Sequence, residues 1–153
     1  MIANIFVGQV IAMTMAQSAG PQVRKLDPLE AVFRDTTPVD RKVDSIDVAA
    51  GEVAEWQVVV RVTTGATVTA RASTLKRVQG DGDLRGVKCR FIGYAAVLKP
   101  PTWVSSTQLR KIPNDFPAPL LVDQSISVGA GQSQALWVDV AIPKETPAGL
   151  YSG

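Results

Sequence analysis

The sequence predicts an all-β fold in which two antiparallel sheets pack against each other. Four runs of residues alternate between apolar and polar side chains, which is typical of strands with one buried face. Further short runs, separated by Gly, Pro and Asp, raise the expected number of strands to about seven, as in many two-sheet sandwiches. At 153 residues the chain has the size of one domain, so it can bury a core without a disulfide or a metal.

The two most regular strands are expected at residues 55–62 and 135–142. One face of the first carries Trp56, Val58, Val60 and Val62, and one face of the second carries Leu136, Val138, Val140 and Ile142. Val59 is an apolar exception on the otherwise polar face of the first strand. Pro143 should end the second strand, because proline cannot donate a hydrogen bond to the ladder.

Two further strands are expected at residues 66–73 and 87–98. The stretch 63–65 (TTG) looks like a short hairpin between the first of these and the strand before it. The run 87–98 is largely apolar on both faces, which is typical of a central strand covered on both sides. It contains Cys89, which we expect to be a small core residue rather than a reactive thiol.

Weaker strands are expected at residues 22–26, 43–48 and 125–128. Residues 28–33 are the only helical material, enough for about one and a half turns. A long, extended surface loop is expected at residues 99–123, because this stretch holds Pro100, Pro101, Pro113, Pro117 and Pro119.

The N-terminus has a different composition. Residues 2–16 are mostly apolar and uncharged, and the small polar stretch 17–20 follows. Residues 1–20 therefore read as a signal peptide cleaved near Ala16 or Ala19, although no basic residue precedes the apolar run. The segment is too short and too interrupted for a membrane span. We expect a secreted, periplasmic or cell-surface domain at residues 21–153; the alternative is that the apolar run is the domain's first helix or strand.

Composition excludes several kinds of chemistry. The chain has no histidine, which removes Ser-His-Asp and Cys-His catalysis and histidine metal sites. A single cysteine cannot form an internal disulfide. The formal charge is +2, and the basic residues are scattered, so neither nucleic-acid binding nor any cofactor is expected.

Paired carboxylates do not form a convincing catalytic or metal site. Glycoside hydrolysis needs two opposed carboxyl groups, but Glu52 and Glu55, like Asp44 and Asp47, are three apart on strands and so point to opposite faces. Asp81-Gly82-Asp83 lacks the remaining ligands of a calcium loop and is better explained as a turn between strands. We therefore expect no catalytic and no metal-binding residues.

Aromatic side chains leave one binding hypothesis open. Sugar-binding domains stack sugar rings on exposed aromatic faces, and Trp103, in the proline-rich segment, is the best candidate. Tyr94 and Trp137 are weaker candidates, because they are expected to pack in the core or against a following domain.

Four segments carry a family resemblance. They are residues 27–33 (DPLEAVF), 49–60 (AAGEVAEWQVVV), 115–120 (DFPAPL) and 135–153 (ALWVDVAIPKETPAGLYSG). In this order they resemble the N-terminal β-sandwich of glycoside hydrolase family 123 and of related uncharacterised glycoside-hydrolase-like proteins. The chain departs from the pattern at Ala118, where the family usually has Asp, and at Trp56, where it usually has Phe.

The resemblance implies an immunoglobulin-like or galactose-binding-like β-sandwich. In the family a catalytic (β/α) barrel follows, with an Asp-Glu pair that acts on the acetamido group of the sugar itself. None of that barrel lies in these residues. In the family about five more residues, a typical strand length, complete the strand that begins at Tyr151, so the resemblance implies that the sandwich lacks its final strand and leaves an open edge.

Three functions follow as hypotheses. The first is a non-catalytic accessory domain that supports a catalytic barrel, which is then its main partner. The second is a carbohydrate-binding module that acts through Trp103, with carbohydrate as partner. The third is an adhesion or interaction sandwich that is unrelated to sugar.

Overall fold

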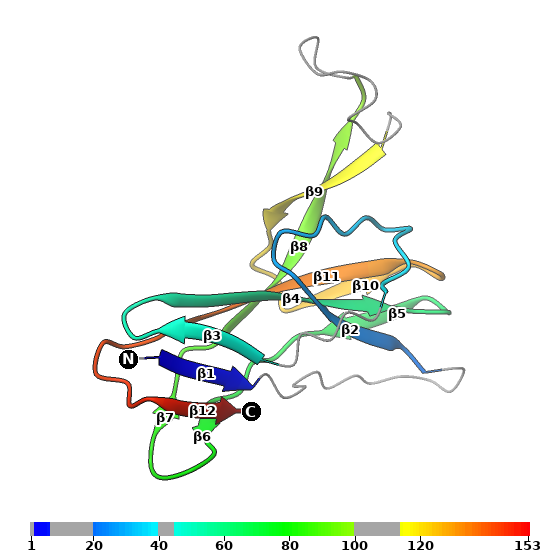
Figure 1. Ribbon diagram of the computed structural model, residues 1–153. Coiled ribbons are helices and arrows are strands. Elements are labelled where there is room, and N and C mark those ends of the chain that lie inside the picture. The colour runs from blue at the N-terminus through cyan, green and yellow to red at the C-terminus, as the bar shows by residue number, and fades with distance from the viewer. Residues whose placement is uncertain (1, 7–19, 40–44, 100–113) are drawn as a thin grey trace.

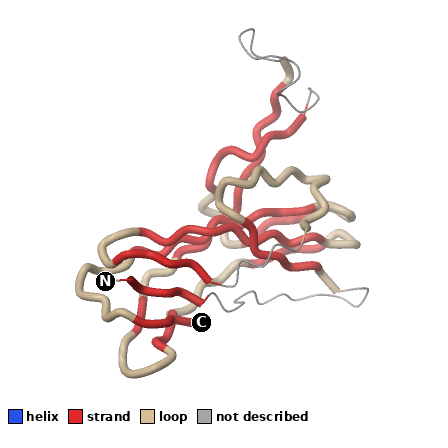
Figure 2. Tube along the Cα trace, in the orientation of Figure 1, coloured by secondary structure: helices blue, strands red, loops and turns tan. Residues whose placement is uncertain are grey.

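The computed structural model describes residues 2–6, 20–39, 45–99 and 114–153. These residues form strands, turns and loops and contain no helix (Figure 2). Accordingly, no helix of the described part could cross a membrane. The all-β prediction is confirmed.

The strands form three sheets (Figure 1). The mixed sheet has the order β3 (Ser45–Ala49), β1 (Ile2–Phe6), β12 (Gly149–Ser152), β6 (Leu75–Arg77) and β7 (Asp83–Leu84). The long sheet has the order β2 (Gln22–Leu26), β4 (Val53–Arg61), β11 (Ser133–Ala141), β8 (Lys88–Val97) and β9 (Asn114–Leu120). The small sheet pairs β10 (Ser125–Val128) with β5 (Ala66–Thr69). The pairing of β1 with β12 is parallel and the others are antiparallel.

The main core lies between the long sheet and the other two. Its buried side chains come from strands of all three sheets, and Tyr151 and Phe91 are the largest that are fully buried. The alternating residues of β4 and β11 enter this core as the sequence predicts, from Trp56 to Val62 and from Leu136 to Ile142. Alternation therefore identified the inner face of the long sheet, and the prediction of a β-sandwich is confirmed, with three sheets in place of the two expected.

A second, smaller core covers the opposite face of the long sheet. Here Val59 packs with Leu26, Val32, Ile92 and Ala135. The cover is the segment of residues 27–38, which crosses this face after β2 (Figure 1). The long sheet is thus buried on both sides near its middle, which explains why Val59 breaks the polar pattern of its face.

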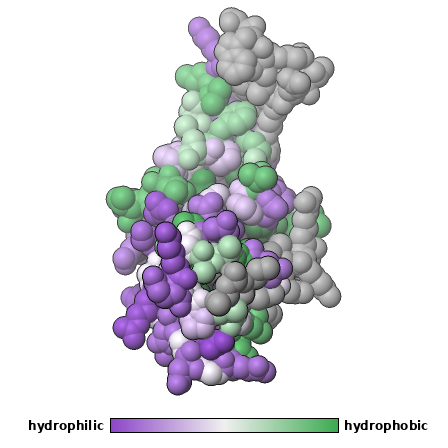
Figure 3. Space-filling view, turned by 60° about the vertical axis from the view of Figure 1, so that its left-hand side comes forward, coloured by the Kyte–Doolittle hydropathy of each residue, from purple (hydrophilic) through white to green (hydrophobic). Residues whose placement is uncertain are grey.

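Strands β8 and β9 continue beyond the body of the sandwich as an arm. The pairing of β11 with β8 involves residues 88–91, whereas β9 pairs with residues 92–97 (Figure 1). Apolar residues gather in the upper part of the space-filling view, where this arm lies (Figure 3). The prediction of a strand covered on both faces is confirmed at Phe91 and Ile92, but Ala95 and Ala96 on the arm are exposed.

The covering segment holds the base of the arm. The rings of Phe33 and Phe116 meet edge to face, with centroids 5.4 Å apart. The guanidinium carbon of Arg34 lies 4.3 Å from the centroid of the Tyr94 ring, and its Nε lies 3.6 Å from a carboxylate oxygen of Asp115. Such aromatic and cation–π contacts contribute about 0.5–1.5 kcal/mol each.

The expectation of a long, extended surface loop at residues 99–123 is wrong for residues 114–120. Residues 114–120 form β9, which pairs with β8 through a register shift between Ile92 and Tyr94. Strand β9 is at the edge of the sheet, where Pro117 and Pro119 are tolerated because an outward backbone position needs no donor. The remainder of the predicted loop lies largely outside the described residues.

Two local predictions also fail. Residues 63–65 do not connect a hairpin, because both edges of β4 are taken by β2 and β11, and β5 pairs with β10 instead. Residues 28–33 form no helix. Asp27 begins a turn there: its Oδ1 accepts from the Leu29 N–H at 2.8 Å, and its backbone oxygen accepts from the Glu30 N–H at 3.1 Å.

The chain ends of the sandwich meet in the mixed sheet. Strand β1 lies between β3 and β12, so the apolar N-terminal run contributes a strand in the uncleaved chain (Figure 1). Strand β12 is short, with four residues, but both of its sides are paired, one with β1 and the other with β6. The open edge expected from a missing final strand is therefore not found at β12 in the described residues. Removal of residues 1–20 as a signal peptide stays a prediction.

Candidate functional site

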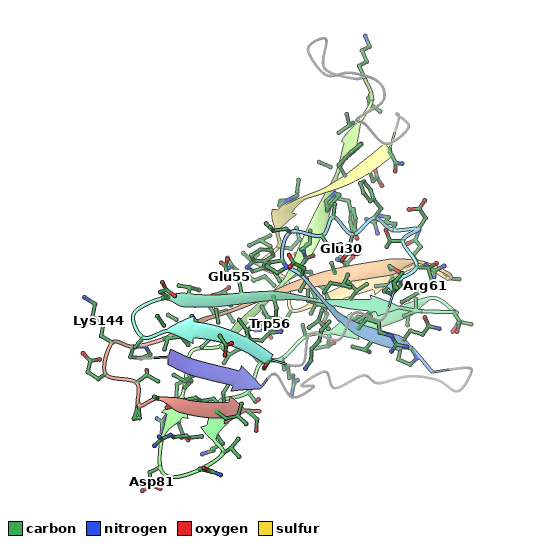
Figure 4. The ribbon with its side chains drawn as sticks, viewed as in Figure 1. Glu30, Glu55, Trp56, Arg61, Asp81 and Lys144 are labelled. Atoms are coloured by element: carbon green, nitrogen blue, oxygen red, sulfur yellow. The ribbon has the colours of Figure 1, made fainter. Side chains whose placement is uncertain are left out.

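The carboxylates singled out from the sequence do not gather in one site. Glu55 and Trp56 point to opposite sides of β4, and Asp81 lies away from Glu55, at the lower end of the molecule in this view (Figure 4). Glu52 is used locally, since its Oε2 accepts from the Ala49 N–H at 3.2 Å. Asp44 lies outside the described residues. Among the residues that the structure describes, no three His, Cys, Asp or Glu side chains could share a metal ion.

The Asp-Gly stretch is a turn, as predicted. It connects β6 with β7, and Gly82 has a φ of 142°. Asp83 begins β7, where its carboxylate contacts Lys76 at 3.1 Å and Arg85 at 3.7 Å. These ion pairs explain the acidic side chain of Asp83 by a structural role in the turn.

Cys89 is half-buried and packs against the main core. Burial raises the pKa of its thiol, which lowers the fraction of reactive thiolate. Tyr94 is also half-buried, and its hydroxyl donates a long hydrogen bond to the backbone oxygen of Ser133 at 3.5 Å. Burial raises the pKa of this phenol, while the charge of Arg34 and a backbone hydrogen bond at Ala135 act to lower it. Trp103 lies outside the described residues.

The most distinctive site is an open pocket of about 320 Å³ on the outer face of the long sheet, which we call the outer-face pocket. It lies where three parts of the fold meet. The sheet supplies Gln57, Ile92 and Trp137; the other walls are residues 28–32 of the covering segment and Pro117, Ala118 and Leu120 of β9. The volume falls at the lower end of the roughly 300–1,000 Å³ that is typical of small-molecule sites.

Gln57 belongs to the lining of this site and is only 3% exposed. Its Nε2 lies 2.8 Å from the backbone oxygen of Pro28, 2.9 Å from that of Glu30 and 3.2 Å from that of Asp27. The two N–H groups of the amide are thus committed to the covering segment. Its Oε1 is buried and accepts no hydrogen bond. A buried acceptor without a donor costs about 1–3 kcal/mol, so it needs an explanation.

The rest of the pocket is apolar and lacks positive charge. The half-buried Trp137 packs against the second core beside Ile92, while Leu29 and Leu120 expose 93% and 39% of their surfaces. Glu30 is the one ionisable residue among the lining residues, and it already has an interaction within the protein. No Lys or Arg belongs to this lining, so it offers no ion pair to an anion.

Sequence reasoning did not find this pocket. Each of the four segments that carry the family resemblance contributes to it: Leu29 from the first, Gln57 from the second, Leu120 from the third and Trp137 from the fourth. They are separated by up to about a hundred residues, and only the covering segment and the bent edge strand bring them together. The one sequence feature that could have indicated it is Val59, because an apolar residue on the otherwise polar face of β4 indicates that this face is covered.

Fold and site together define a β-sandwich domain with a covered outer face. No protein-family model matches the sequence, and no curated protein matches it. The fold is similar to part of the solved structure of a family 123 glycoside hydrolase from Clostridium perfringens, an enzyme of glycolipid glycan hydrolysis. The TM-score is 0.57 at 10% sequence identity, and the match covers 86% of this chain and 23% of that chain. At this identity the comparison shows a shared fold, and this chain spans less than a quarter of the larger protein.

Proposed function

We propose that this chain is a non-catalytic accessory β-sandwich of a glycoside-hydrolase-like protein, where it supports a catalytic barrel. The observation that carries the proposal is the match of its fold to a 23% portion of a family 123 glycoside hydrolase. The four sequence segments that resemble the N-terminal sandwich of that family support the same assignment. A secreted or cell-surface location, after removal of residues 1–20, belongs to this proposal.

The arrangement of acidic residues supports a non-catalytic role. Hydrolysis of a glycosidic bond uses two carboxyl groups roughly 5–9.5 Å apart in a cleft. Glu30 is the one carboxylate among the residues that line the outer-face pocket, and Asp81 lies far from it (Figure 4). Support of a neighbouring domain needs no such pair, only a rigid body, and the doubly covered long sheet supplies one.

The direct test is to read the genomic DNA that follows the codon for Gly153. The proposal predicts a sequence encoding a (β/α) barrel, either in frame or restored by a single frame shift. A stop codon with no barrel in any frame would remove the main support for the accessory role and favour the adhesion or interaction sandwich.

Carbohydrate binding through Trp103 is the second candidate function. It is tested by isothermal titration of the chain and of Trp103→Ala with amino-sugar oligosaccharides. Heat of binding that disappears in the variant supports it, and equal binding by both proteins rejects that residue as the contact.

A further inference from the structure

We propose that a second pocket, which we call the Arg77 pocket, binds a carboxylate group through the guanidinium of Arg77. The pocket has a volume of about 290 Å³ and lies between the end of β6 and the start of β12, in the lower part of Figure 1. Its lining residues are Arg77, Val78, Gln79, Ala148, Gly149 and Leu150. The inference goes beyond the accessory role and does not rest on it, because all these residues belong to this chain.

Arg77 carries a charge that the fold leaves without a counterion. Arg34, Arg85 and Arg90 each form an ion pair with an aspartate. Arg77 is half-buried and pairs with no carboxylate of the residues that the structure describes. Its Nη2 donates to a neutral acceptor, the backbone oxygen of Ala148, and its Nε is buried without a partner. A partly buried cation of this kind favours an anionic ligand, because hydrogen bonds between charged groups are stronger than those between neutral ones.

The guanidinium is held against the wall of the pocket by close contact with the backbone. A Cβ atom at Gly149 would lie 2.8 Å from Nε, and one at Gly80 would lie 3.2 Å from Nη1, so glycine is needed at both places for the backbone to come so near. Within the described residues, Nη1 donates no hydrogen bond and is not among the buried nitrogen atoms without a partner, so it is accessible to solvent. Nη1 therefore remains as the donor for a carboxylate oxygen.

The other lining residues limit the kind of ligand. Val78 and Leu150 expose 53% and 39% of their surfaces, and both line the pocket, so they offer apolar contact to a short hydrocarbon group. Arg77 is the one cationic residue of the lining, so a single negative charge is matched better than the two charges of a phosphate. The volume also fits a small ligand, since small-molecule sites typically begin at roughly 300 Å³. The best match is a monocarboxylate with a short, branched apolar group.

The experiment follows the Arg77 Nε–H signal of the full, ¹⁵N-labelled chain by nuclear magnetic resonance, with the signal assigned through the backbone. Titration with isobutyrate at constant ionic strength should shift this signal saturably. Isobutyramide, which has the same shape without the charge, should bind at least about tenfold more weakly. N-acetylglycylvaline presents the same chemistry as a peptide C-terminus. If it binds more tightly than isobutyrate, the ligand is a peptide end, and the reverse order indicates a free acid; both results support a carboxylate site.

The variants test the same site by affinity. Arg77→Gln should weaken isobutyrate binding at least about tenfold, whereas the matched control Arg71→Gln, at an exposed position, should leave it unchanged within about twofold. If Arg77→Gln fails to fold, the comparison of isobutyrate with isobutyramide on the natural chain still decides. No saturable shift with either carboxylate, equal binding of isobutyramide, undiminished binding by Arg77→Gln, or tighter binding of inorganic phosphate would overturn the proposal. None of these outcomes bears on whether a barrel follows.

Discussion

The side-chain amide of Gln57 donates a hydrogen bond to the backbone oxygen of Pro28, at 2.8 Å, across the outer face of the long sheet. This contact joins the middle of β4 to the turn at the start of the covering segment. Because the same amide also reaches the oxygens of Asp27 and Glu30, one side chain satisfies three backbone groups of an irregular segment. Gln57 therefore holds the cover, and the cover forms one wall of the pocket.

Replacement of Gln57 by Leu should lower the free energy of unfolding by about 1–3 kcal/mol, because three backbone oxygens lose their donor, and this loss outweighs the removal of the one unpaired acceptor, Oε1. Chemical denaturation followed by tryptophan fluorescence measures the change. The matched control is Gln79→Leu, at an exposed position, which should alter stability by less than about 0.5 kcal/mol. Equal effects of the two variants would show that the three contacts do not hold the covering segment.

Tyr94 should make stability depend on alkaline pH. Burial raises the pKa of its phenol in the folded state, whereas an unfolded tyrosine titrates near pH 10. Its contribution is therefore fully present below about pH 10 and is lost as pH rises through the folded-state pKa. Tyr94→Phe should lose less stability than the natural chain when the pH rises from about 9 to about 11. Parallel pH curves for the two proteins would contradict this account of Tyr94.

Cys89 should react slowly. Its raised pKa and partial burial reduce both the thiolate fraction and access, so the folded chain should react with an aromatic disulfide reagent at pH 8 more slowly than glutathione does. Addition of denaturant should abolish the difference. If Cys89 in the folded chain reacts as fast as glutathione, the alternative that Cys89 is a reactive nucleophile would be favoured.

Removal of residues 1–20 should promote self-association. Strand β1 separates β3 from β12, so its loss leaves the backbone groups of two strand edges without partners. Sedimentation velocity of the shortened and complete chains at equal concentration measures the effect. A shortened chain that stays monomeric and melts at the same temperature would show that β1 contributes nothing to the fold.

The regular part of the fold could be predicted from the sequence because one physical signal dominates there. In β4 the inward residues are apolar, and in β11 they are apolar from Leu136 onward, with the buried Gln134 as the exception; the period of two then fixes both the strand and its face. Strands β2 and β10 were also predicted with the bounds observed, Gln22–Leu26 and Ser125–Val128.

The failures have a common cause, which is context from distant residues. The prolines of residues 99–123, Pro117 among them, suggested a loop, because the local sequence does not show that Pro117 lies on an edge strand, where a proline is tolerated. Residues 63–65 suggested a hairpin because the sequence does not show that the edges of β4 are already occupied. The outer-face pocket depends on both features, since it needs β9 as a wall and the covering segment as another. Its residues could be recognised only once the tertiary arrangement was known.

The central proposal is that this sandwich acts by contact and performs no chemistry of its own. The most direct measurement is the release of nitrophenol from aryl N-acetyl-β-hexosaminides by the purified, folded chain. The account predicts release at the uncatalysed rate at every protein concentration. Release that rises in proportion to the chain and disappears when the chain is unfolded would contradict it.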